Sequence, residues 1–319
     1  MHSESWDVII VGAGSGGLSA ALMLGRARRR VLVIDGGAPR NGVAAHMHGV
    51  LGRDGWSPLD LVATGRAEVE RYGVVVTPGE VVSAEQVESG FAIELGSGER
   101  HFASRMLIAT GLRDELPEIP GLAEQWGSGA VVCPYCDGWE VRDRRIAVLA
   151  TGPMSTHQAQ MLRQWSPEVT FFTNARELTD ADTAPLVARG IAVERRAVTA
   201  VSADADGRLR GIRLANGDTV AVDSIFLHPR VVPNDALLRG LGAATTDGFG
   251  GAPWVEVDAT GRTSVPTLWA VGNVVNPSAS VPVASGAGNV AGATINADLI
   301  EEEIRDAVAA HTPIVSAAV

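Results

Sequence analysis

Cysteine is scarce in this chain, which contains only Cys133 and Cys136, separated by Pro134 and Tyr135. Two thiols cannot build the framework of several disulfides that stabilises small secreted domains. A zinc site would need two further ligands, and neither a second Cys-x-x-Cys pair nor a histidine pair at zinc-finger spacing follows, so we predict no metal site. A disulfide across two residues also closes too short a loop to add much stability. The pair is therefore interpreted as a redox dithiol that exchanges two electrons at a time.

Basic side chains are outnumbered, and long apolar runs are lacking. The 26 Lys and Arg residues face 37 Asp and Glu residues, so the formal net charge is -11. This charge disfavours nucleic acid and anionic membranes as partners. No apolar run reaches the roughly 20 residues that span a bilayer, and no signal peptide precedes the first predicted strand. With so few cysteines, we expect a cytoplasmic protein.

The N-terminal segment has the pattern of a dinucleotide-binding unit. Residues 8–11 and 31–34 are β-branched apolar runs, typical of buried parallel strands. Glycines and a helical segment lie between them. In such a unit the first glycine permits a tight turn, the second lets the backbone approach a pyrophosphate, and the third lets the helix pack on the strand, while the helix N-terminus offers amide donors to phosphates. The predicted phosphate-binding residues are Gly12, Gly14, Ser15, Gly16 and Gly17.

An acidic residue ends the second of these strands. Asp35 follows the glycines by about 20 residues, the spacing at which an acid binds the ribose hydroxyls of a dinucleotide. A turn residue at the end of a strand is the alternative interpretation of Asp35. The order of strand, glycine turn, helix, strand and acid predicts an α/β fold with a parallel sheet.

A second unit repeats this pattern later in the chain. Residues 11–24 align without a gap with residues 149–162, and the apolar run 169–172 follows as the matching second strand. Such an internal repeat predicts two similar domains. We predict a discontinuous first domain, residues 1–113 and 245–319, and a second domain of residues 114–244 that carries the cysteines.

The glycine turn of the second unit departs from the first. Ala150 takes the place of Gly12, and Ser155 takes the place of Gly17. Pro153 has no amide hydrogen, so one potential phosphate donor is missing. The second unit therefore has the shape of a nucleotide site without all of its donors.

Taken together, these segments resemble the low-molecular-weight thioredoxin reductases over essentially the whole chain. The shared segments are Gly12 to Gly17, Ile108 to Gly111, Cys133 to Gly138, Val232 to Asn234 and Gly272 to Val274. The resemblance implies two Rossmann-like domains of the three-layer ββα type and a homodimer. It also implies that the first domain binds FAD and that the second, which resembles an NADPH domain, carries the cysteine pair.

The resemblance further implies roles for individual residues. Cys136 would face the flavin, Cys133 would exchange with the substrate, and Asp137 would carry a proton. His46 and His48 could lie near the flavin or act as a base for a substrate thiol, because histidine titrates in the required range. The alternative interpretation is that both are loop histidines that cap or hydrogen-bond. The residues implied in FAD binding, besides the first glycine turn and Asp35, are Arg40, Asn41, His48, Ala109, Thr110, Gly111, Gly272 and Asn273.

Three departures separate this chain from ordinary reductases. Residues 173–175, Thr-Asn-Ala, replace the His-Arg-Arg that clamps the NADPH phosphate in the family. Asn273 replaces an aspartate that contacts FAD, and residues 279–280, Ala-Ser, replace an Arg-Gln pair. The first departure argues against NADPH as the electron donor.

Residues 35–41 and 46–49 are similar to segments of the dithiol oxidases of disulfide natural-product pathways, such as gliotoxin and holomycin biosynthesis. This similarity implies that a small-molecule dithiol passes electrons through the cysteine pair to FAD and then to oxygen, without NADPH. Asp137 instead matches the reductases, since the oxidases often have histidine there. Two alternatives stay open: a reductase of thioredoxin-like proteins, fed by NADPH or another donor, and a flavin-bound redox sensor without turnover.

Overall fold

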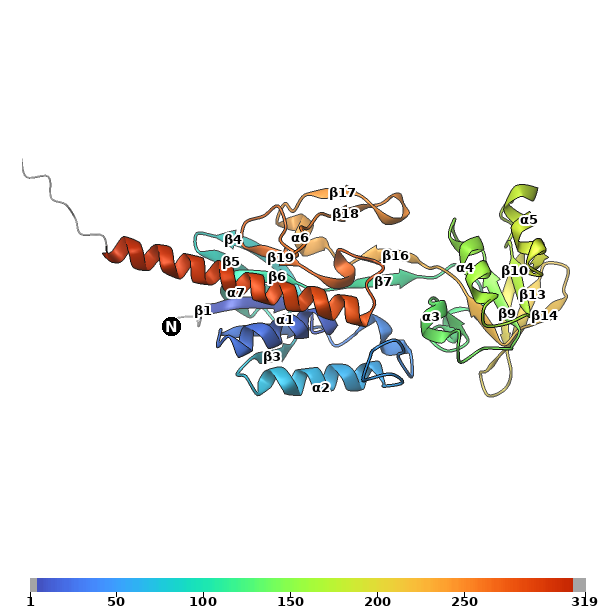
Figure 1. The fold of residues 1–319 in the computed structure, drawn as a ribbon, viewed down its shortest axis with the longest axis horizontal. Coiled ribbons are helices and arrows are strands. Elements are labelled where there is room, and N and C mark those ends of the chain that lie inside the picture. The colour runs from blue at the N-terminus through green and yellow to red at the C-terminus, as the bar shows by residue number, and fades with distance from the viewer. Residues whose placement is uncertain (1–4, 312–319) are drawn as a thin grey trace, which may run out of the picture. The chain divides into compact units, whose positions relative to one another are not determined.

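The computed structural model describes residues 5–311 and divides into two compact units (Figure 1). The first unit comprises Met1–Pro39, Leu59–Leu112 and Pro233–Val319, and the second comprises Arg40–Pro58 and Arg113–Val232. This division differs from the boundaries predicted from sequence at two places. Residues 40–58 belong with the second unit and residues 233–244 with the first, because those are the units that these segments contact.

A seven-stranded sheet forms the centre of the first unit. Its parallel part has the order β3-β2-β1-β6, with β19 also pairing with β6, and β4 and β5 extend it as an antiparallel meander from β6. The strands are β1 (Ser5–Val11), β2 (Val31–Asp35), β3 (Val75–Pro78), β4 (Val81–Val87), β5 (Gly90–Leu95), β6 (Arg100–Ile108) and β19 (Leu268–Ala270).

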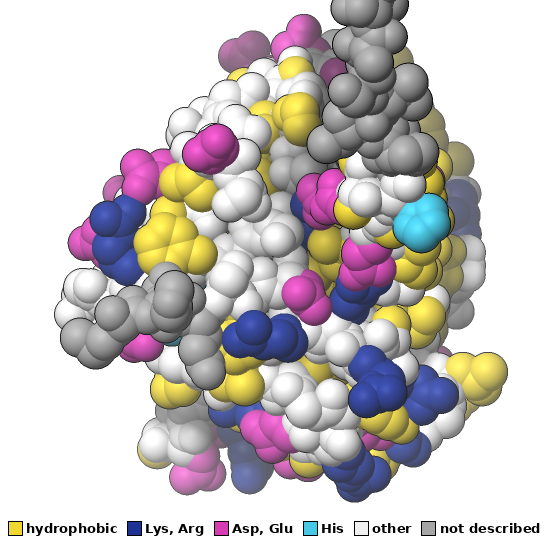
Figure 2. Space-filling view, turned by 90° about the vertical axis from the view of Figure 1, so that its left-hand side faces the viewer, with side chains coloured by type: hydrophobic (Ala, Val, Ile, Leu, Met, Phe, Trp, Pro, Cys, Tyr) yellow, Lys and Arg dark blue, Asp and Glu magenta, His cyan; other side chains and the backbone are white. Residues whose placement is uncertain are grey.

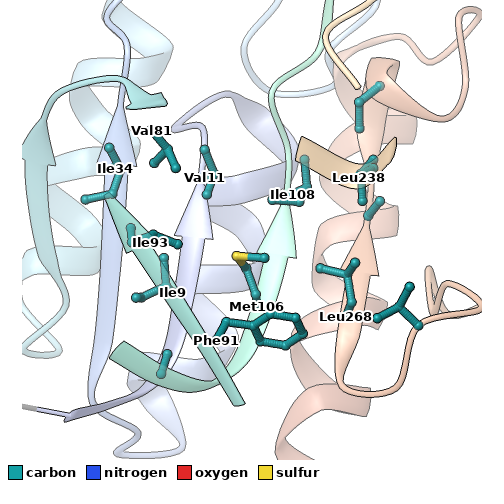
Figure 3. Close-up of a cluster of buried hydrophobic side chains, with 14 of the residues drawn as sticks. Ile9, Val11, Ile34, Val81, Phe91, Ile93, Met106, Ile108, Leu238 and Leu268 are labelled. Carbon is teal, nitrogen blue, oxygen red and sulfur yellow. The ribbon is translucent and has the colours of Figure 1, made fainter. Parts of the chain in front are cut away.

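Strand β1 is apolar throughout its second half because both faces of the sheet are covered. Val8 and Ile10 face the core beneath α1 (Ser15–Arg26), α2 (Pro58–Glu70) and α7 (Val281–His311). Ile9 and Val11 face the opposite core, together with Phe91 and Met106 (Figure 3). The unit thus has three layers: helices, parallel sheet and meander.

Helix α7 packs against α1 with very little space between their backbones (Figure 1). A Cβ added to Gly288 of α7 would lie 2.0 Å from the carbonyl oxygen of Gly16 in α1. A Cβ on Gly292 would lie 2.8 Å from the carbonyl oxygen of Ala20. Glycine is therefore required at Gly288, and α7 holds the start of α1 in place. The smaller elements of this unit are α6 (Ala236–Gly240), β17 (Thr245–Asp247), β18 (Pro253–Val255) and the 3₁₀ turns η3 (Phe249–Gly251) and η4 (Gly272–Val274).

The second unit repeats the layers of the first. Its parallel sheet has the order β11-β10-β9-β15-β8, and β12, β13 and β14 form an antiparallel meander. One core lies between sheet and meander, and another lies between sheet and helices. Its elements are η1 (Arg40–Val43), η2 (Ala123–Gln125), β8 (Ala130–Val131), α3 (Pro134–Asp137), β9 (Ile146–Leu149), α4 (Ser155–Leu162), β10 (Val169–Phe172), α5 (Asp180–Ala188), β11 (Ala192–Glu194), β12 (Val198–Ala203), β13 (Leu209–Leu214), β14 (Thr219–Ala221) and β15 (Ser224–Phe226).

These two sheets confirm the predicted α/β class with two Rossmann-like units. Two of the four points at which the chain passes from one unit to the other lie within a two-stranded ladder of β7 (Leu112–Glu115) and β16 (Arg230–Pro233). Within residues 5–311, no helix combines the length and apolar composition needed to cross a membrane. On the face drawn in Figure 2, Lys and Arg side chains lie mostly in the lower half, and Asp and Glu side chains are more frequent in the upper half.

Candidate functional site

The two cysteines lie at the start of the short helix α3 in the second unit. Cys133 is the N-cap residue, Pro134 begins the helix, and the two sulfurs form a disulfide across a Cα–Cα distance of 5.2 Å. The amide hydrogens of Cys136 and Asp137 both donate to the carbonyl of Cys133, at 3.1 Å. Proline fits the first helical position because it has no amide hydrogen to lose. The local sequence therefore closes a turn that brings both sulfurs together.

Glycine and aromatic residues support this turn. A Cβ on Gly138 would lie 2.5 Å from the carbonyl oxygen of Pro134 and 2.9 Å from the Trp165 ring, so no larger residue fits there. Tyr135 meets Trp165 edge to face, with ring centroids 6.0 Å apart, yet 77% of Tyr135 stays exposed. Trp139 is also exposed, at 63%. Apolar rings therefore flank the cysteine pair and are accessible from outside this unit's core.

Asp137 carries a carboxyl group with an unusual proton affinity. Its pKa is raised from 3.8 to about 6, chiefly by burial and in addition by the nearby Glu140 carboxylate, while His48 opposes both effects. Among the described residues, no hydrogen bond or ion pair engages the Asp137 side chain. A carboxyl group with this pKa can take up and release a proton close to neutral pH.

His48 reaches this place from the loop 40–58, which belongs to the same unit. Its Nε2 lies 3.4 Å from Oε1 of Glu140, and its Nδ1 lies 3.3 Å from Oδ2 of Asp54. Asp54 also accepts the Gly49 amide hydrogen at 2.9 Å, and this bond, followed by the one to His48, lowers the pKa of Asp54. The imidazole is thus held between two carboxylates beside Asp137. Glu140 and Asp54 were not predicted from sequence; the spacing Asp137-x-x-Glu140 on one turn was the available signal.

The loop 40–58 is fixed at its start by an ion pair. Arg40 donates to both carboxylate oxygens of Asp114, each at 2.8 Å, and the Asp114 side chain is almost fully buried. Close packing adds to this, because a Cβ on Gly127 would lie 2.7 Å from the carbonyl oxygen of Val43. Two of the residues predicted to bind FAD, Arg40 and Asn41, lie here, and the Arg40 guanidinium is already engaged by Asp114.

The first glycine turn has the features of a phosphate-binding turn. Gly12 has φ +108°, and a Cβ there would lie 2.4 Å from the carbonyl oxygen of Ala109. A Cβ on Gly17 would lie 1.9 Å from the carbonyl oxygen of Gly12, whereas one on Gly14 would meet no atom within 4 Å. Gly14 is the N-cap of α1 and provides no side-chain cap, and no acid lies in the first turn. The amides of residues 15–17 thus receive no side-chain acceptor at the cap, an arrangement that suits the pyrophosphate of FAD.

Asp35 ends β2 beside this turn, where the sequence predicted an acid for the ribose. One carboxylate oxygen accepts the Gly37 amide hydrogen at 2.9 Å, and the other pairs with Arg66 of α2. A carboxylate offers about four acceptor positions, so these two partners leave room for ribose hydroxyls. The structure therefore fits the FAD that the fold implies, with Arg66 as a partner that the sequence did not reveal.

The remaining predicted FAD residues shape two loops of the first unit. Thr110 Oγ1 donates to the Asn234 carbonyl at 2.7 Å, and Asn234 Nδ2 donates back to the Thr110 carbonyl at 2.9 Å. The Asn234 amide donates to Gly111, whose φ is +68°. Asn273 Nδ2 donates to the carbonyls of residues 276 and 279, both at 3.0 Å, and so closes the loop before α7. Ala109 pairs with β1 through its amide.

A pocket of about 680 Å³ lies in the second unit, at the carboxyl ends of β10 and β11. This is the edge at which α/β sheets bind ligands. The pocket is lined by Thr173, Ala175, Arg176, Glu177, Leu178, Thr179 and Arg195. No three His, Cys, Asp or Glu side chains within residues 5–311 are placed to hold a metal ion.

Comparison with known proteins gives consistent results. The crystal structure of HlmI matches with a TM-score of 0.92 at 46% sequence identity and covers 97% of both chains. That of an oxidoreductase from Agrobacterium tumefaciens matches at 0.87 with 38% identity, over 93% of this chain and 99% of that one. Thioredoxin reductase tcpT of Claviceps purpurea is 30% identical over 93% of this chain and 95% of its own length.

A family model describes most of the chain as well. The model of the pyridine nucleotide-disulphide oxidoreductases matches residues 6–288, which includes the first glycine turn, the cysteine pair and the start of α7. Its extent agrees with that of the relatives and solved structures. The chain therefore belongs to the pyridine nucleotide-disulphide oxidoreductase family and is a thioredoxin reductase-like, FAD-binding enzyme.

Proposed function

We propose that this protein is a dithiol oxidase, which converts a small-molecule dithiol to a disulfide through Cys133 and Cys136, with FAD as cofactor and oxygen as final acceptor. The observation that carries the proposal is the disulfide at the start of α3 next to a carboxyl group whose pKa is raised to about 6. A disulfide accepts electrons from a thiolate, and the adjacent carboxyl group can take up the proton that the thiol loses.

The electrons and protons balance as follows. A substrate thiolate attacks one sulfur of the disulfide, and the second substrate thiol releases the mixed disulfide, so the substrate loses two electrons and two protons. Cys133 and Cys136 would then re-form their bond and give up two electrons, for which bound FAD would supply the acceptor. Oxygen finally accepts two electrons and two protons as hydrogen peroxide. Asp137 would carry one of the protons at the cysteine pair.

The preferred direction rests on the second unit. Thr173, which stands where the first unit has Asp35, is only 1% exposed, and its hydroxyl donates to the Arg195 carbonyl at 3.3 Å. It is therefore turned inward and unsuited to a ribose. The exposed rings of Tyr135 and Trp139 beside the cysteines suit an apolar or aromatic small molecule as the source of electrons.

A reductase of thioredoxin-like proteins is the second candidate, and Asp137 favours it. The position after the second cysteine carries this acid in the reductases that the sequence resembles. In that direction the same carboxyl group would donate the proton that it accepts in dithiol oxidation, because the two reactions share the disulfide exchange step. The two candidates differ in the electron source and use the same cysteines.

An anaerobic flavin spectrum separates the two. One sample of the FAD-loaded protein is mixed with NADPH and a second sample with dithiothreitol. The absorbance of oxidised flavin, at roughly 450 nm, is followed in both. We expect loss of absorbance with the dithiol alone, and hydrogen peroxide on admission of air. Rapid loss with NADPH would instead establish the reductase.

A cysteine variant tests the path of the electrons. Cys136→Ser should lower the rate of flavin reduction by the dithiol at least about a hundredfold, because the disulfide can no longer form. Ser166→Ala, which removes a buried serine hydroxyl elsewhere in the same unit, serves as the control and should react like the wild type. Unchanged flavin reduction in Cys136→Ser would contradict the proposed path.

A further inference from the structure

The second glycine turn, between β9 and α4, has two of its backbone amides already occupied from within. The hydroxyl oxygen of Ser155 accepts the amide hydrogen of Thr151 at 3.1 Å and that of Gly152 at 3.2 Å. Ser155 is only 1% exposed. By the alignment of residues 11–24 with residues 149–162, these two amides stand where the first turn has those of Ala13 and Gly14, directly before the helix whose first amides face a pyrophosphate. Here one buried side chain provides the acceptor instead.

The backbone of this turn is built to accept the serine. At the matching place in the first turn, a Cβ on Gly17 would lie 1.9 Å from the carbonyl oxygen of Gly12, which has φ +108°. Ala150, which takes the place of Gly12, is not in the left-handed region. The backbone at Ala150 therefore differs from that at Gly12, and the second turn accommodates the Cβ of Ser155.

Further bonds hold Thr151 on its remaining sides. Its carbonyl oxygen accepts from Nη1 of Arg176 at 3.2 Å, and its hydroxyl oxygen accepts the amide hydrogen of His228 at 3.2 Å. The next position after Gly152 is Pro153, which has no amide hydrogen. Thus every backbone donor from Thr151 to Pro153 is either engaged with Ser155 or missing, and both polar oxygens of Thr151 are engaged.

We propose that Ser155 determines cofactor specificity, because its hydroxyl closes the second glycine turn to the pyrophosphate of a nicotinamide dinucleotide. A phosphate oxygen could reach these amides only by displacing a buried hydroxyl, which would then be left without its donors. This inference deepens the proposed function and rests on it, because a closed turn agrees with electrons that come from the substrate and not from a nicotinamide. Thr173 stands where the first unit has Asp35, so the second unit also lacks an acid for the ribose. This is a separate departure and would not by itself close the turn.

The test uses the FAD-loaded protein and isothermal titration with NADPH and, separately, NADH. Ser155→Ala removes the internal acceptor and keeps the Cβ. We expect the wild type to show no saturable binding below millimolar nucleotide, and Ser155→Ala to bind both nucleotides at least tenfold more tightly, since the pyrophosphate is common to both. The matched control is Ser166→Ala, whose hydroxyl is equally buried but donates to the Arg144 carbonyl and accepts from Glu168.

Two results would overturn the proposal. One is micromolar binding of either nucleotide by the wild type. The other is Ser155→Ala binding no more tightly than Ser166→Ala while its flavin content and unfolding midpoint match those of the control. Equal binding by Ser155→Ala and Ser166→Ala is a case of this second result, because a general loosening of the unit would then explain the binding by both variants.

A measurement on the unaltered chain covers the case in which Ser155→Ala fails to fold. Amide hydrogen exchange of the peptide 149–155 should be slow at Thr151 and Gly152, because Ser155 accepts both hydrogens. Adding millimolar NADPH should leave these rates unchanged. Exchange at the rate of an unprotected peptide, or added protection by NADPH, would contradict the closed turn.

These outcomes are independent of the test of the proposed function. Ser155 is placed in neither the cysteine pair nor the FAD site, so Ser155→Ala should keep flavin reduction by a dithiol within about twofold of the wild-type rate. A chain that oxidises dithiols but binds NADPH tightly refutes only the closed turn. A chain that binds neither NADPH nor reacts with dithiols refutes only the dithiol oxidase.

Discussion

The turn after β1 and the turn after β9 occupy the same position in two similar sheets, but their backbone amides are satisfied differently. In the first turn Gly14 offers α1 no side-chain cap, and Gly17 leaves no room for any side chain. In the second turn the hydroxyl of Ser155 accepts two amide hydrogens. The sheet and helix that frame a nucleotide site are therefore preserved in a unit whose donors are used internally. Architecture and ligand chemistry can thus separate within one fold.

The two units also treat an acid at the site differently. Asp35 in the first unit is paired with Arg66 and accepts the Gly37 amide hydrogen. No hydrogen bond or ion pair engages the Asp137 side chain in the part of the chain that the structure describes, and its pKa is raised to about 6, chiefly by burial. A paired carboxylate stays charged and can hold a ligand, whereas an unpaired, partly buried one can exchange a proton. The first unit is thus suited to binding and the second to chemistry.

The largest expected effect is on FAD binding and comes from placing a side chain at Gly17, where the first turn has no room for one. Gly17→Ala places a methyl group 1.9 Å from the Gly12 carbonyl oxygen, so the first turn must rearrange. We expect at least about 3 kcal/mol weaker FAD binding, because such overpacking has no flexible neighbour to yield. The ratio of flavin absorbance to protein measures it. Gly152→Ala in the second turn, where a Cβ meets nothing within 4 Å, should keep full flavin content. Equal flavin content in both variants would remove the first turn as the FAD site.

A second variant tests the contact between α7 and α1, which supports the first turn and, among the described residues, has no counterpart at the second turn. Gly288→Ala would place its Cβ 2.0 Å from the Gly16 carbonyl oxygen. We expect a loss of about 2 kcal/mol in the free energy of unfolding, measured with urea, because two helix backbones must separate. Gly286→Ala on the same helix meets nothing within 4 Å and should stabilise by up to about 1 kcal/mol, since alanine favours helices. Destabilisation by both variants would show that helix α7 tolerates no added methyl group, whatever its contacts.

The unpaired acid of the second unit predicts a pH dependence of stability. Because the pKa of Asp137 is raised from 3.8 to about 6, the folded chain keeps a proton there that the unfolded chain releases. Its contribution to stability is complete below pH 4 and is lost as the pH rises to about 6. Asp137→Asn should therefore gain about 1 to 2 kcal/mol relative to the wild type across this window, a value reduced for partial exposure.

Urea unfolding of both proteins from about pH 3 to about pH 7.5 measures this difference. Asp54→Asn is the matched control with the opposite sign, because the Gly49 amide and His48 lower the pKa of Asp54. Relative to that variant, the wild type should gain stability as the pH rises through the acid range. A pH-independent difference for Asp137→Asn would contradict the raised pKa.

The smallest effect concerns the arginine at the second turn. Arg176 donates to the Thr151 carbonyl from an exposed position, so Arg176→Ala should cost only about 0.5 kcal/mol of folding stability. Its effect on NADPH affinity should stay below about threefold, since the carbonyl is not a phosphate donor. Titration of Arg176→Ala and Ser155→Ala with NADPH measures the affinity, and urea unfolding measures the stability. If Arg176→Ala raised the NADPH affinity more than Ser155→Ala does, the arginine and not the serine would be the residue that closes the turn.

Much of the fold followed from local patterns. The apolar run at residues 8–11 predicted a doubly covered strand, and Val8 and Ile9 indeed face opposite cores. The late segment was less predictable: β19 ends at Ala270, but the 3₁₀ turn η4 intervenes and α7 begins only at Val281. Asn273 holds this intervening loop through three carbonyls, a contact set that no residue spacing indicates.

The site was predictable only in part. The cysteine pair and the two glycine turns are short contiguous motifs, so the sequence placed them. The partners of single side chains were not predictable: Asp114 engages Arg40, Arg66 pairs with Asp35, and Glu140 lies beside His48. Each of these pairs joins segments far apart in the chain, and charged residues are too frequent for their order to identify partners.

The sequence by itself determined the reaction chemistry available to this protein and the class of its fold. Two cysteines at helix-turn spacing and a complete glycine turn after an apolar strand are decided by neighbours within a few residues, where backbone geometry is nearly fixed. Only the tertiary structure decided how the second turn is closed. Ser155 lies close in sequence to the amides it binds, but whether its hydroxyl meets them depends on the backbone at Ala150 and on the packing that buries the side chain.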